Sequence, residues 1–340
     1  MIIRVCDLGG THCRIGQYVD GDLNVASVAR FKNSDHASFP ALMRHYHDSS
    51  GMAPAERLVI ALAAPVTGDV VALTNLDWTI DRDEISRATG VPNVSLINDF
   101  EALGHALSSP QSLELRCLNE GDDDISGTKL ILGAGTGFNC AAHLSNGSVV
   151  CCEAGHSTFV AETEFDRALQ QRFTQDFGRC SFDRVLSGSG LGAIYQTVCG
   201  LENRTPVYAT SHQIIPAALG PDDALATRAC HEFVRILGRA AGDLALVFLA
   251  TGGVYVTGGV ARGLAAFMSG PDSRFLPAFK AKGRMAGTMA TFPISLVLDD
   301  NTALRGCLEW TRKVAPKLRF HACTFSSNCI QLDATCETPG

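Results

Sequence analysis

Apolar and polar positions in the first hundred residues predict a small sheet followed by strand and helix units. The runs IIRVCDLGG, THCRIGQYVDG and LNVASVARF are apolar or alternating, and glycines separate them. The Asp20-Gly21 pair between the second and third runs is a hairpin signal. The following residues predict a strand in LVIALAAPV, a helix after Asp81, a strand in VSLIN and a helix that Asp99 opens.

The same order of signals returns near residue 129. The runs KLILGAGTG, FNCAAHLSNG and SVVCCEAGH again give strand, glycine turn, strand, tight turn and strand, with Asn146-Gly147 at the second hairpin. Helical periodicity follows in EFDRALQQRF and over residues 222–249, and VYVT is typical of a buried strand that ends at Gly258-Gly259. This order predicts an α/β protein of two domains, each beginning with an antiparallel meander.

The same pattern predicts the domain boundaries. We assign residues 1–109 and 300–314 to a small α/β domain and residues 110–299 to a large one. The run from Asn301 to Lys313 predicts a last helix that returns to the first domain. No clear period continues beyond it, so we predict that residues 315–340 form a loosely attached tail.

Composition narrows the function classes. The chain has 340 residues, of which 46% are hydrophobic, enough for buried cores. A net charge of -7 without a dense Lys/Arg stripe argues against nucleic-acid binding. The stretch LALVFLATGGVYV is too short and too interrupted to span a membrane. Because MIIRVCDLGG enters a strand-like run at once, we expect a cytoplasmic protein with no membrane partner.

The 13 cysteines predict reduced thiols rather than a metal cluster. Most lie singly in apolar runs, where a thiol packs as a small hydrophobic group. No CxxC pair occurs, and the spacing of Cys323, Cys329 and Cys336 matches no zinc pattern. Adjacent Cys151 and Cys152 point to opposite faces of a strand, so they are poor joint ligands for one zinc ion.

Two glycine turns are candidate phosphate sites. Gly9-Gly10-Thr11 and Gly135-Thr136-Gly137 each follow a buried strand, where glycines let backbone N–H groups approach a phosphate. Asp7 would repel a phosphate by itself, so its natural partner is a hydrated Mg²⁺. Either turn alone also fits a β-turn that needs positive φ. As a pair, each leading a matching meander, they favour phosphate binding.

Two segments resemble known nucleotide-binding motifs but lack features that those motifs require. GAGTGF resembles the start of a dinucleotide-binding fingerprint, but a hairpin-like run follows it instead of a helix. GDDDISGTKL lacks the Gly-Lys-Ser/Thr order of a P-loop and precedes a strand. The sequence therefore disfavours an NAD-dependent oxidoreductase and a Walker-type site.

Six segments together resemble the bacterial glucokinases of the hexokinase, actin and Hsp70 superfamily. They are DLGGT, LINDF, GAGTG, EAGH, RVLSGSGL and VTGGV, in the family order and spread over residues 3–312. The resemblance implies two actin-like (ribonuclease H-like) α/β domains with a cleft between them, in which ATP and a sugar meet. It further implies phosphorylation of glucose at its 6-hydroxyl, with ATP and Mg²⁺, by a protein that forms a homodimer.

The resemblance also implies residue roles. Asp99 is the expected general base, although aspartate at this position also fits a helix N-cap. The expected sugar ligands are Asn98, Glu153, His156 and Asp183; the alternative is a buried structural His156 and a surface Glu153. We expect Asp7 to hold Mg²⁺ through water. The nucleotide is expected to contact Asp7, Gly9, Gly10, Thr11, Gly135, Thr136, Gly137, Gly258 and Gly259. The run Ser187-Gly188-Ser189-Gly190 fits a turn near the adenosine or a plain loop.

Four positions depart from the family pattern. Cys6 replaces a small residue, His12 an asparagine and Ala154 a glycine, and Asp183 stands where the family has a sugar-binding glutamate. A carboxylate one methylene shorter reaches the same hydroxyl only through water, which changes discrimination between sugars. Two alternatives therefore stay open: a kinase for another hexose or an amino sugar, and a non-catalytic sugar-binding relative.

Overall fold

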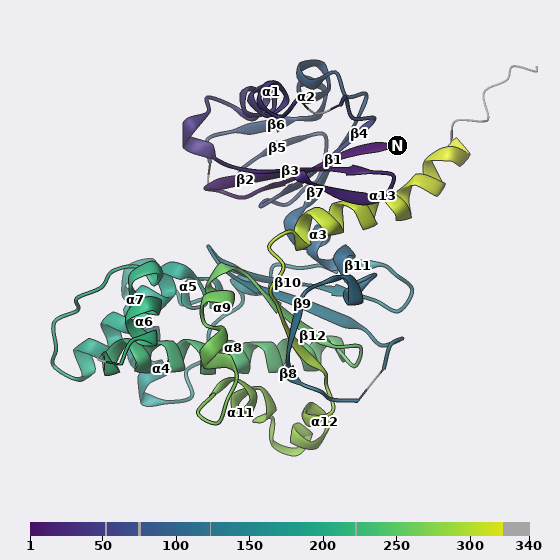
Figure 1. The fold of residues 1–340 in the computed structure, drawn as a ribbon. Helices are drawn as coiled ribbons and strands as arrows, with labels where there is room; N and C mark the ends of the chain where they lie inside the picture. Colours follow the sequence, from purple (N-terminus) through teal and green to yellow (C-terminus); the bar gives the residue numbers. More distant parts are fainter. Residues whose placement is uncertain (52, 74–75, 123, 222, 322–340) are drawn as a thin grey trace, which may run out of the picture.

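The computed structural model describes residues 1–321 except 52, 74–75, 123 and 222. Its first lobe contains a five-stranded sheet (Figure 1). Strands β1, β2 and β3 form an antiparallel meander, and β1, β4 and β7 run parallel. The order across this sheet is β3 (Asp22–Lys32), β2 (His12–Val19), β1 (Ile2–Leu8), β4 (Arg57–Leu62) and β7 (Asn93–Asn98).

The second lobe repeats this arrangement. Strands β9, β10 and β11 form the second meander, and β9, β12 and β13 run parallel. The order is β11 (Val149–Cys151), β10 (Phe138–His143), β9 (Lys129–Ala134), β12 (Val254–Thr257), β13 (Ile294–Val297) and β8 (Leu115–Asn119). The predicted duplication is confirmed. Strand β8 and the separate hairpin of β5 (Val70–Ala72) and β6 (Thr79–Asp81) were not predicted. Strands of three to five residues are too short to show a recognisable alternation of apolar and polar side chains.

Helices cover both sheets, and the helices predicted after Asp81, in EFDRALQQRF and over 222–249 are all present. The α-helices are α1 (Phe39–Ser50), α2 (Arg82–Thr89), α3 (Asp99–Ala106), α4 (Glu164–Phe177), α5 (Phe182–Val185), α6 (Gly188–Leu201), α7 (Ser211–Leu219), α8 (Ala224–Phe248), α9 (Gly259–Gly263), α10 (Ala265–Met268), α11 (Phe275–Lys280), α12 (Ala286–Ala290) and α13 (Thr302–His321). The 3₁₀ helices are η1 (Asn33–Asp35), η2 (Pro110–Ser112), η3 (Ala154–His156) and η4 (Gly283–Met285).

Alternation along β1 explains why the first sheet is buried on both faces. Cys6 and Leu8 join a cluster with α1, whereas Ile3 and Val5 join a cluster with α13. Successive side chains of a strand point to opposite faces, so one apolar strand supplies two cores. The sheet is therefore fixed between helices, and its glycine turn at the carboxyl end of β1 has a rigid base.

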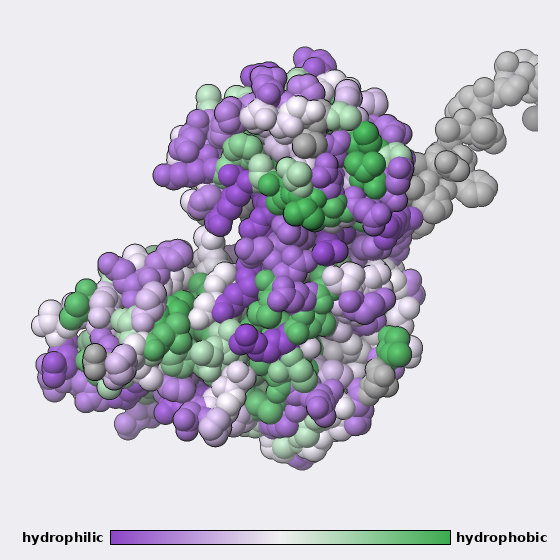
Figure 2. All heavy atoms as spheres, viewed as in Figure 1, coloured by the Kyte–Doolittle hydropathy of each residue, from purple (hydrophilic) through white to green (hydrophobic). Residues whose placement is uncertain are grey.

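Helices α3 and α13 join the two lobes. Helix α13 packs on α3, β1 and β4, while α3 also contacts β10 and β11 of the second sheet. Figure 1 shows both helices at the narrow neck, and Figure 2 shows hydrophilic residues at this neck beside the hollow between the lobes. The last helix thus returns to the first sheet, as predicted. Asp99, the first residue of α3, lies at this joint.

The predicted tail begins too early. Helix α13 continues to His321, so residues 315–321 are helical, although the sequence pattern predicted no helix there. Once a helix is formed, each further residue adds at little cost, and Lys317, Leu318 and Arg319 are good helix formers. Residues 322–340, with Cys323, Cys329 and Cys336, lie outside the described residues. The predicted domain boundaries stay a prediction.

Over the described part of the chain, no helix is both long enough and apolar enough to cross a lipid bilayer. Within the same residues the cysteines are free thiols, and no group of three or more His, Cys, Asp or Glu side chains is arranged to hold a metal ion.

Candidate active site

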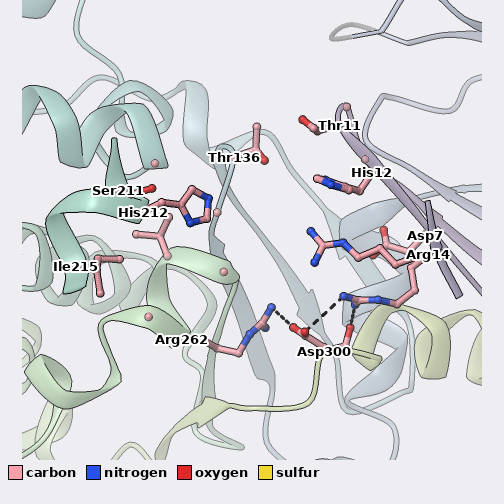
Figure 3. Close-up of a pocket in the computed structure, with 18 of the residues that line it drawn as sticks. Asp7, Thr11, His12, Arg14, Thr136, Ser211, His212, Ile215, Arg262 and Asp300 are labelled. Carbon is pink, nitrogen blue, oxygen red and sulfur yellow. Dashed lines mark hydrogen bonds and ion pairs between the residues drawn. The ribbon is translucent and has the colours of Figure 1, made fainter. Parts of the chain in front are cut away.

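A cavity of about 740 Å³ lies between the two lobes. Both meanders contribute to it, the first through residues of β1 and β2 and the turn between them, the second through the turn after β9. Figure 3 shows the residues of the first lobe on one side of the cavity and those of α7 and α9 on the other. The lining residues are Asp7, Gly9, Gly10, Thr11, His12, Arg14, Arg30, Gly135, Thr136, Gly188, Ser211, His212, Ile215, Pro216, Gly259, Val260, Arg262, Gly263 and Asp300.

The first glycine turn is held by buried polar contacts. The Gly9 N–H donates to the His12 carbonyl at 3.0 Å, closing the turn between β1 and β2. The buried Asn33 side chain donates to the Gly9 carbonyl at 2.8 Å, and the Asn33 N–H donates to the Thr11 carbonyl at 2.9 Å. These bonds occupy carbonyl groups of the turn. Our sequence reasoning missed Asn33, whose only signal is its place just after β3.

The second glycine turn lies against two helix starts. The Gly135 N–H donates to the Gly137 carbonyl at 2.9 Å, and the Gly188 N–H donates to the Gly135 carbonyl at 2.9 Å. Gly258 has a φ of 102°, and a side chain there would overlap the Ala134 carbonyl. Gly259 then opens α9. Only glycine fits this close crossing of backbones.

The structure brings most of the predicted nucleotide residues together. Those that line the common cavity are Asp7, Gly9, Gly10, Thr11, Gly135, Thr136 and Gly259. Gly137 and Gly258 adjoin lining residues without lining the cavity themselves. Neither the turn nor the plain loop considered for residues 187–190 is present: Ser187 is the N-cap of α6, and its Oγ accepts the Gly190 N–H at 3.0 Å. A serine before a glycine-rich helix start is a cap signal that we overlooked.

Charged side chains gather at one end of the cavity. Asp7 and Arg14 are cross-strand partners in β1 and β2. Asp300, between β13 and α13, makes ion pairs with Arg14 at 3.5 Å and with Arg262 of α9 (Figure 3). One carboxylate thus connects an arginine of the first lobe with an arginine of the second. Arg14, Arg262 and Asp300 come from distant segments, and no local pattern marks them.

Asp7 suits a cation. Burial raises the pKa of its carboxyl, and the charges of Arg14 and Arg262 offset only part of that effect. A divalent cation held through water would stabilise the ionised form, and carboxylate oxygens are ligands that Mg²⁺ prefers. The residues present therefore fit Mg²⁺ carried with a nucleotide phosphate.

The opposite end of the cavity is less polar. Ile215 and Pro216 of α7 and Val260 of α9 line it, together with Ser211 and His212 at the start of α7. Apolar walls with a few polar groups are typical of pockets for flat heterocycles such as a purine base. None of these residues was predicted, because isolated apolar residues on helices do not differ from core positions in sequence.

Asp99 occupies a half-buried position where β7 ends. Burial raises the pKa of its carboxyl to about 7, with further contributions from the negative charges of Asp7 and Glu153. The N-cap of α3 is Asn98, whose Oδ1 accepts the N–H groups of Phe100 and Glu101 at 2.9 and 3.2 Å. The alternative that Asp99 caps the helix is therefore wrong. Strands β1, β4 and β7 are parallel neighbours, so Asp99 after β7 lies at the same edge of the sheet as Asp7 near the end of β1. Helix α3, which Asp99 opens, contacts β11, and the EAGH segment follows that strand.

The predicted sugar residues form a second group beside this point, outside the residues that line the cavity. Glu153 directly precedes η3, and His156 is its last residue; their side chains are 52% and 70% exposed, so the alternative of a buried His156 is wrong. Glu153 accepts a hydrogen bond from the Asn139 amide at 3.1 Å. Asp183 accepts the Phe138 N–H at 2.9 Å and lies against Gly137 and Gly155. Asn98 donates its amide to the Ala64 carbonyl at 3.1 Å.

Two sheets of one topology around a glycine-lined cavity define the class of two-domain, actin-like sugar kinases. The family model described as "Glucokinase" matches residues 5–314, and the chain belongs to this family.

The similarity to other glucokinases extends along most of the chain. The glucokinase of Caulobacter vibrioides is 34% identical over 314 residues, covering 89% of this chain and 92% of the relative. The glucokinase of Caulobacter sp. (strain K31) is 32% identical over 309 residues, with the same coverage of each chain. A crystal structure of a glucokinase from an Antarctic psychrotroph superposes with a TM-score of 0.76 at 28% identity, covering 92% of this chain and 99% of that one.

Proposed function

We propose that this protein transfers the terminal phosphoryl group of ATP to the 6-hydroxyl of a hexose, with glucose as the preferred substrate. The observation that carries the proposal is the position of Asp99. Asp99 lies at the carboxyl edge of the parallel strands β1, β4 and β7 with Asp7 on the nucleotide side, and its helix α3 contacts β11, which leads to Glu153 on the proposed sugar side. Burial raises the pKa of the Asp99 carboxyl to about 7. A single carboxylate between two such groups is suited to move a proton from sugar to solvent as the phosphoryl group is transferred. Membership of the glucokinase family supports this reaction.

In the proposed mechanism Asp99 accepts the proton of the attacking hydroxyl. A base with a pKa near the working pH combines a large ionised fraction with useful basicity. The two glycine turns provide backbone N–H groups for the phosphates, and Asp7 orients the Mg²⁺ that accompanies ATP. MgATP supplies the phosphoryl group and the charge neutralisation. Closure of the two lobes around α3 would exclude water, which otherwise competes with the sugar as nucleophile.

On the sugar side we propose Glu153, His156 and Asp183 as hydrogen-bonding partners of the ring hydroxyls. Their carboxylate and imidazole groups suit a polyol, because each accepts or exchanges directed hydrogen bonds. One oxygen of Asp183 already accepts the Phe138 N–H, which leaves the other for the sugar. An amide nitrogen has two N–H donors, and the Asn98 donor not directed at Ala64 is our candidate for a further hydroxyl.

A sugar panel tests the proposed function. The protein is mixed with ATP and Mg²⁺ and offered glucose, mannose, fructose, N-acetylglucosamine and N-acetylmannosamine, while ADP release is followed by a coupled assay. We expect the highest kcat/KM with glucose. Turnover mainly with an amino sugar would shift the substrate to the alternative that Asp183 leaves open. Sugar binding without ADP release from any member of the panel would favour a non-catalytic relative.

The pH dependence of turnover should report Asp99. Its folded pKa is raised, so the carboxylate that acts as base is present above about pH 7 and is lost as the pH falls through that value. We expect kcat/KM for the sugar to be flat on the alkaline side and to fall about tenfold per pH unit below about pH 6. Initial rates measured from pH 5 to 9 check this. A profile flat down to pH 5 contradicts it.

We expect Arg262→Gln to weaken MgATP binding. The guanidinium faces the cavity, and a charge-assisted hydrogen bond to phosphate contributes roughly 1.5–3 kcal/mol, or about 10- to 100-fold in affinity. The KM for ATP should rise by that factor while the KM for glucose changes little. Arg284→Gln, an exposed arginine outside the cavity, is the matched control. Equal KM values for ATP in both variants would remove Arg262 from the nucleotide site.

The homodimer and the cytoplasmic location remain predictions. Analytical ultracentrifugation of the full chain tests the first, with a dimer mass as the expected result.

A further inference from the structure

Two cysteines face each other beside the proposed sugar site. Cys140 lies in β10, and Cys152 directly follows β11. The two strands are antiparallel with Ala141 opposite Cys151, which places Cys140 and Cys152 as the next pair along the ladder. Their Sγ atoms are 3.3 Å apart, and the Cys152 Sγ is 3.4 Å from the Cys140 carbonyl oxygen. The bond length of a disulfide is about 2.05 Å, so a small approach of the two sulfurs would join them.

The two thiols differ in reactivity. Cys140 is fully buried in the large core of the second lobe, whereas Cys152 is partly buried at its edge. A hydrogen bond from Cys140 and the Ala154 N–H lower the pKa of Cys152. The same hydrogen bond has the opposite effect on the other thiol, so the pKa of Cys140 is raised. Thiolate is the nucleophilic form of cysteine, so Cys152 is the thiol that reacts first with an oxidant.

The residues that follow Cys152 are tied to the same strand. Glu153 accepts the hydrogen bond from Asn139 of β10, and Gly155 packs so closely on the Phe138 carbonyl that a side chain there would overlap it. Cys140, Asn139 and Phe138 therefore support three positions of the segment that carries the proposed sugar ligands. Because Cys140 belongs to the packed core, closing the gap between the sulfurs must move Cys152, and Glu153 with it.

We propose that Cys140 and Cys152 form an oxidisable dithiol that hydrogen peroxide converts to a disulfide, and that this bond weakens sugar binding. The Cys152 thiolate attacks one peroxide oxygen, which gives a sulfenic acid and hydroxide, protonated to water. The Cys140 thiol then attacks that sulfur; the S–S bond forms, and the hydroxyl leaves as a second water with the thiol proton. Each sulfur loses one electron and one peroxide molecule is reduced to two waters. The effect on sugar binding rests on the proposed function, whereas the crosslink does not.

Mass spectrometry tests the crosslink. The reduced protein is treated with a few equivalents of hydrogen peroxide, quenched with an alkylating agent and digested. We expect a peptide pair joined through Cys140 and Cys152 that dithiothreitol separates and that Cys152→Ser abolishes. Cys151→Ser is the matched control: Cys151 lies opposite Ala141, and its side chain points to the other face of the sheet from Cys152, so its replacement should leave the crosslink unchanged. Free Cys140 after oxidation, or a bond from Cys152 to another cysteine, overturns the proposal.

Kinetics of the same samples test the consequence. We expect the KM for the preferred sugar to rise roughly tenfold or more on oxidation, the factor for one charge-assisted hydrogen bond, with the KM for ATP unchanged and full recovery after reduction. After peroxide treatment, the Cys152→Ser variant should have the same KM for the sugar as the reduced enzyme. A crosslinked enzyme with an unchanged sugar KM overturns the regulatory part. A reduced enzyme that phosphorylates no sugar contradicts the proposed function instead, and leaves the mapped crosslink as an independent result.

Discussion

Asp99→Asn is expected to lower kcat by about 10²- to 10⁴-fold, the range that positioned proton transfer contributes. The amide has nearly the shape of the carboxylate but does not accept the hydroxyl proton. The hydrogen bond from the Phe100 N–H can go to the amide oxygen, and the N-cap of α3 is Asn98, so the helix start should persist. Sugar binding, measured by isothermal titration calorimetry without ATP, should stay within a few-fold of wild type. Rates come from the coupled ADP assay.

Asp81→Asn is the matched control. Asp81 also stands at the start of a helix, where its Oδ1 accepts the N–H groups of Asp83 and Glu84 at 2.8 and 3.1 Å. Asparagine is as good an N-cap as aspartate, and Asp81 does not line the cavity, so kcat should not change. If Asp99→Asn keeps near-normal turnover as Asp81→Asn does, Asp99 is not the base.

The duplicated architecture was predictable because it depends on short-range patterns. Strand alternation, the Asp20-Gly21 and Asn146-Gly147 hairpins and the glycine turns all lie within runs of about thirty residues. Such local signals fix the order of the three meander strands in each sheet, since a meander pairs neighbours in sequence. The turns come together in space because both central strands end at the cleft. The place of Asp99 at a strand end was predictable for the same reason, whereas its role as the base was implied by the family resemblance and stays a prediction.

The charged cluster of the cavity was not predictable from such local sequence patterns. Arg14, Arg262 and Asp300 meet only because three distant segments converge, and each alone resembles a surface charge. Helix α13 was predicted to end too early, because a side-chain period disappears before the backbone helix does. At Asn98 and Asp99 the sequence offered two capping residues side by side. Both accept the Phe100 N–H, and only the coordinates show that Asn98 also accepts the Glu101 N–H and is the N-cap.

The joint between the lobes links the proposed base to the charged cluster of the cavity. Helix α3 begins with Asp99, and α13 begins just after Asp300 of the charged cluster. The two helices touch where Gly306 meets Ala102, so close that a side chain at 306 would overlap the Ala102 carbonyl. This close backbone contact is one of the contacts that fix the proposed base relative to the phosphate cavity, together with the apolar packing between α3 and α13.

Gly306→Ala should for this reason destabilise the protein and slow it. Overpacking of this kind costs about 1–3 kcal/mol, and a shift of about 1 Å at the reacting groups can cost roughly 10²-fold in rate. We expect a Tm lower by several degrees in differential scanning calorimetry and a kcat reduced by at least tenfold, with the KM for ATP less affected. Gly200→Ala, in α6 with open space around it, is the control: alanine there should keep kcat and stabilise by up to about 1 kcal/mol, since it lowers the entropy of the unfolded chain. If Gly306→Ala instead keeps both Tm and kcat, α3 and α13 can separate without moving Asp99, and the joint does not set the position of the base.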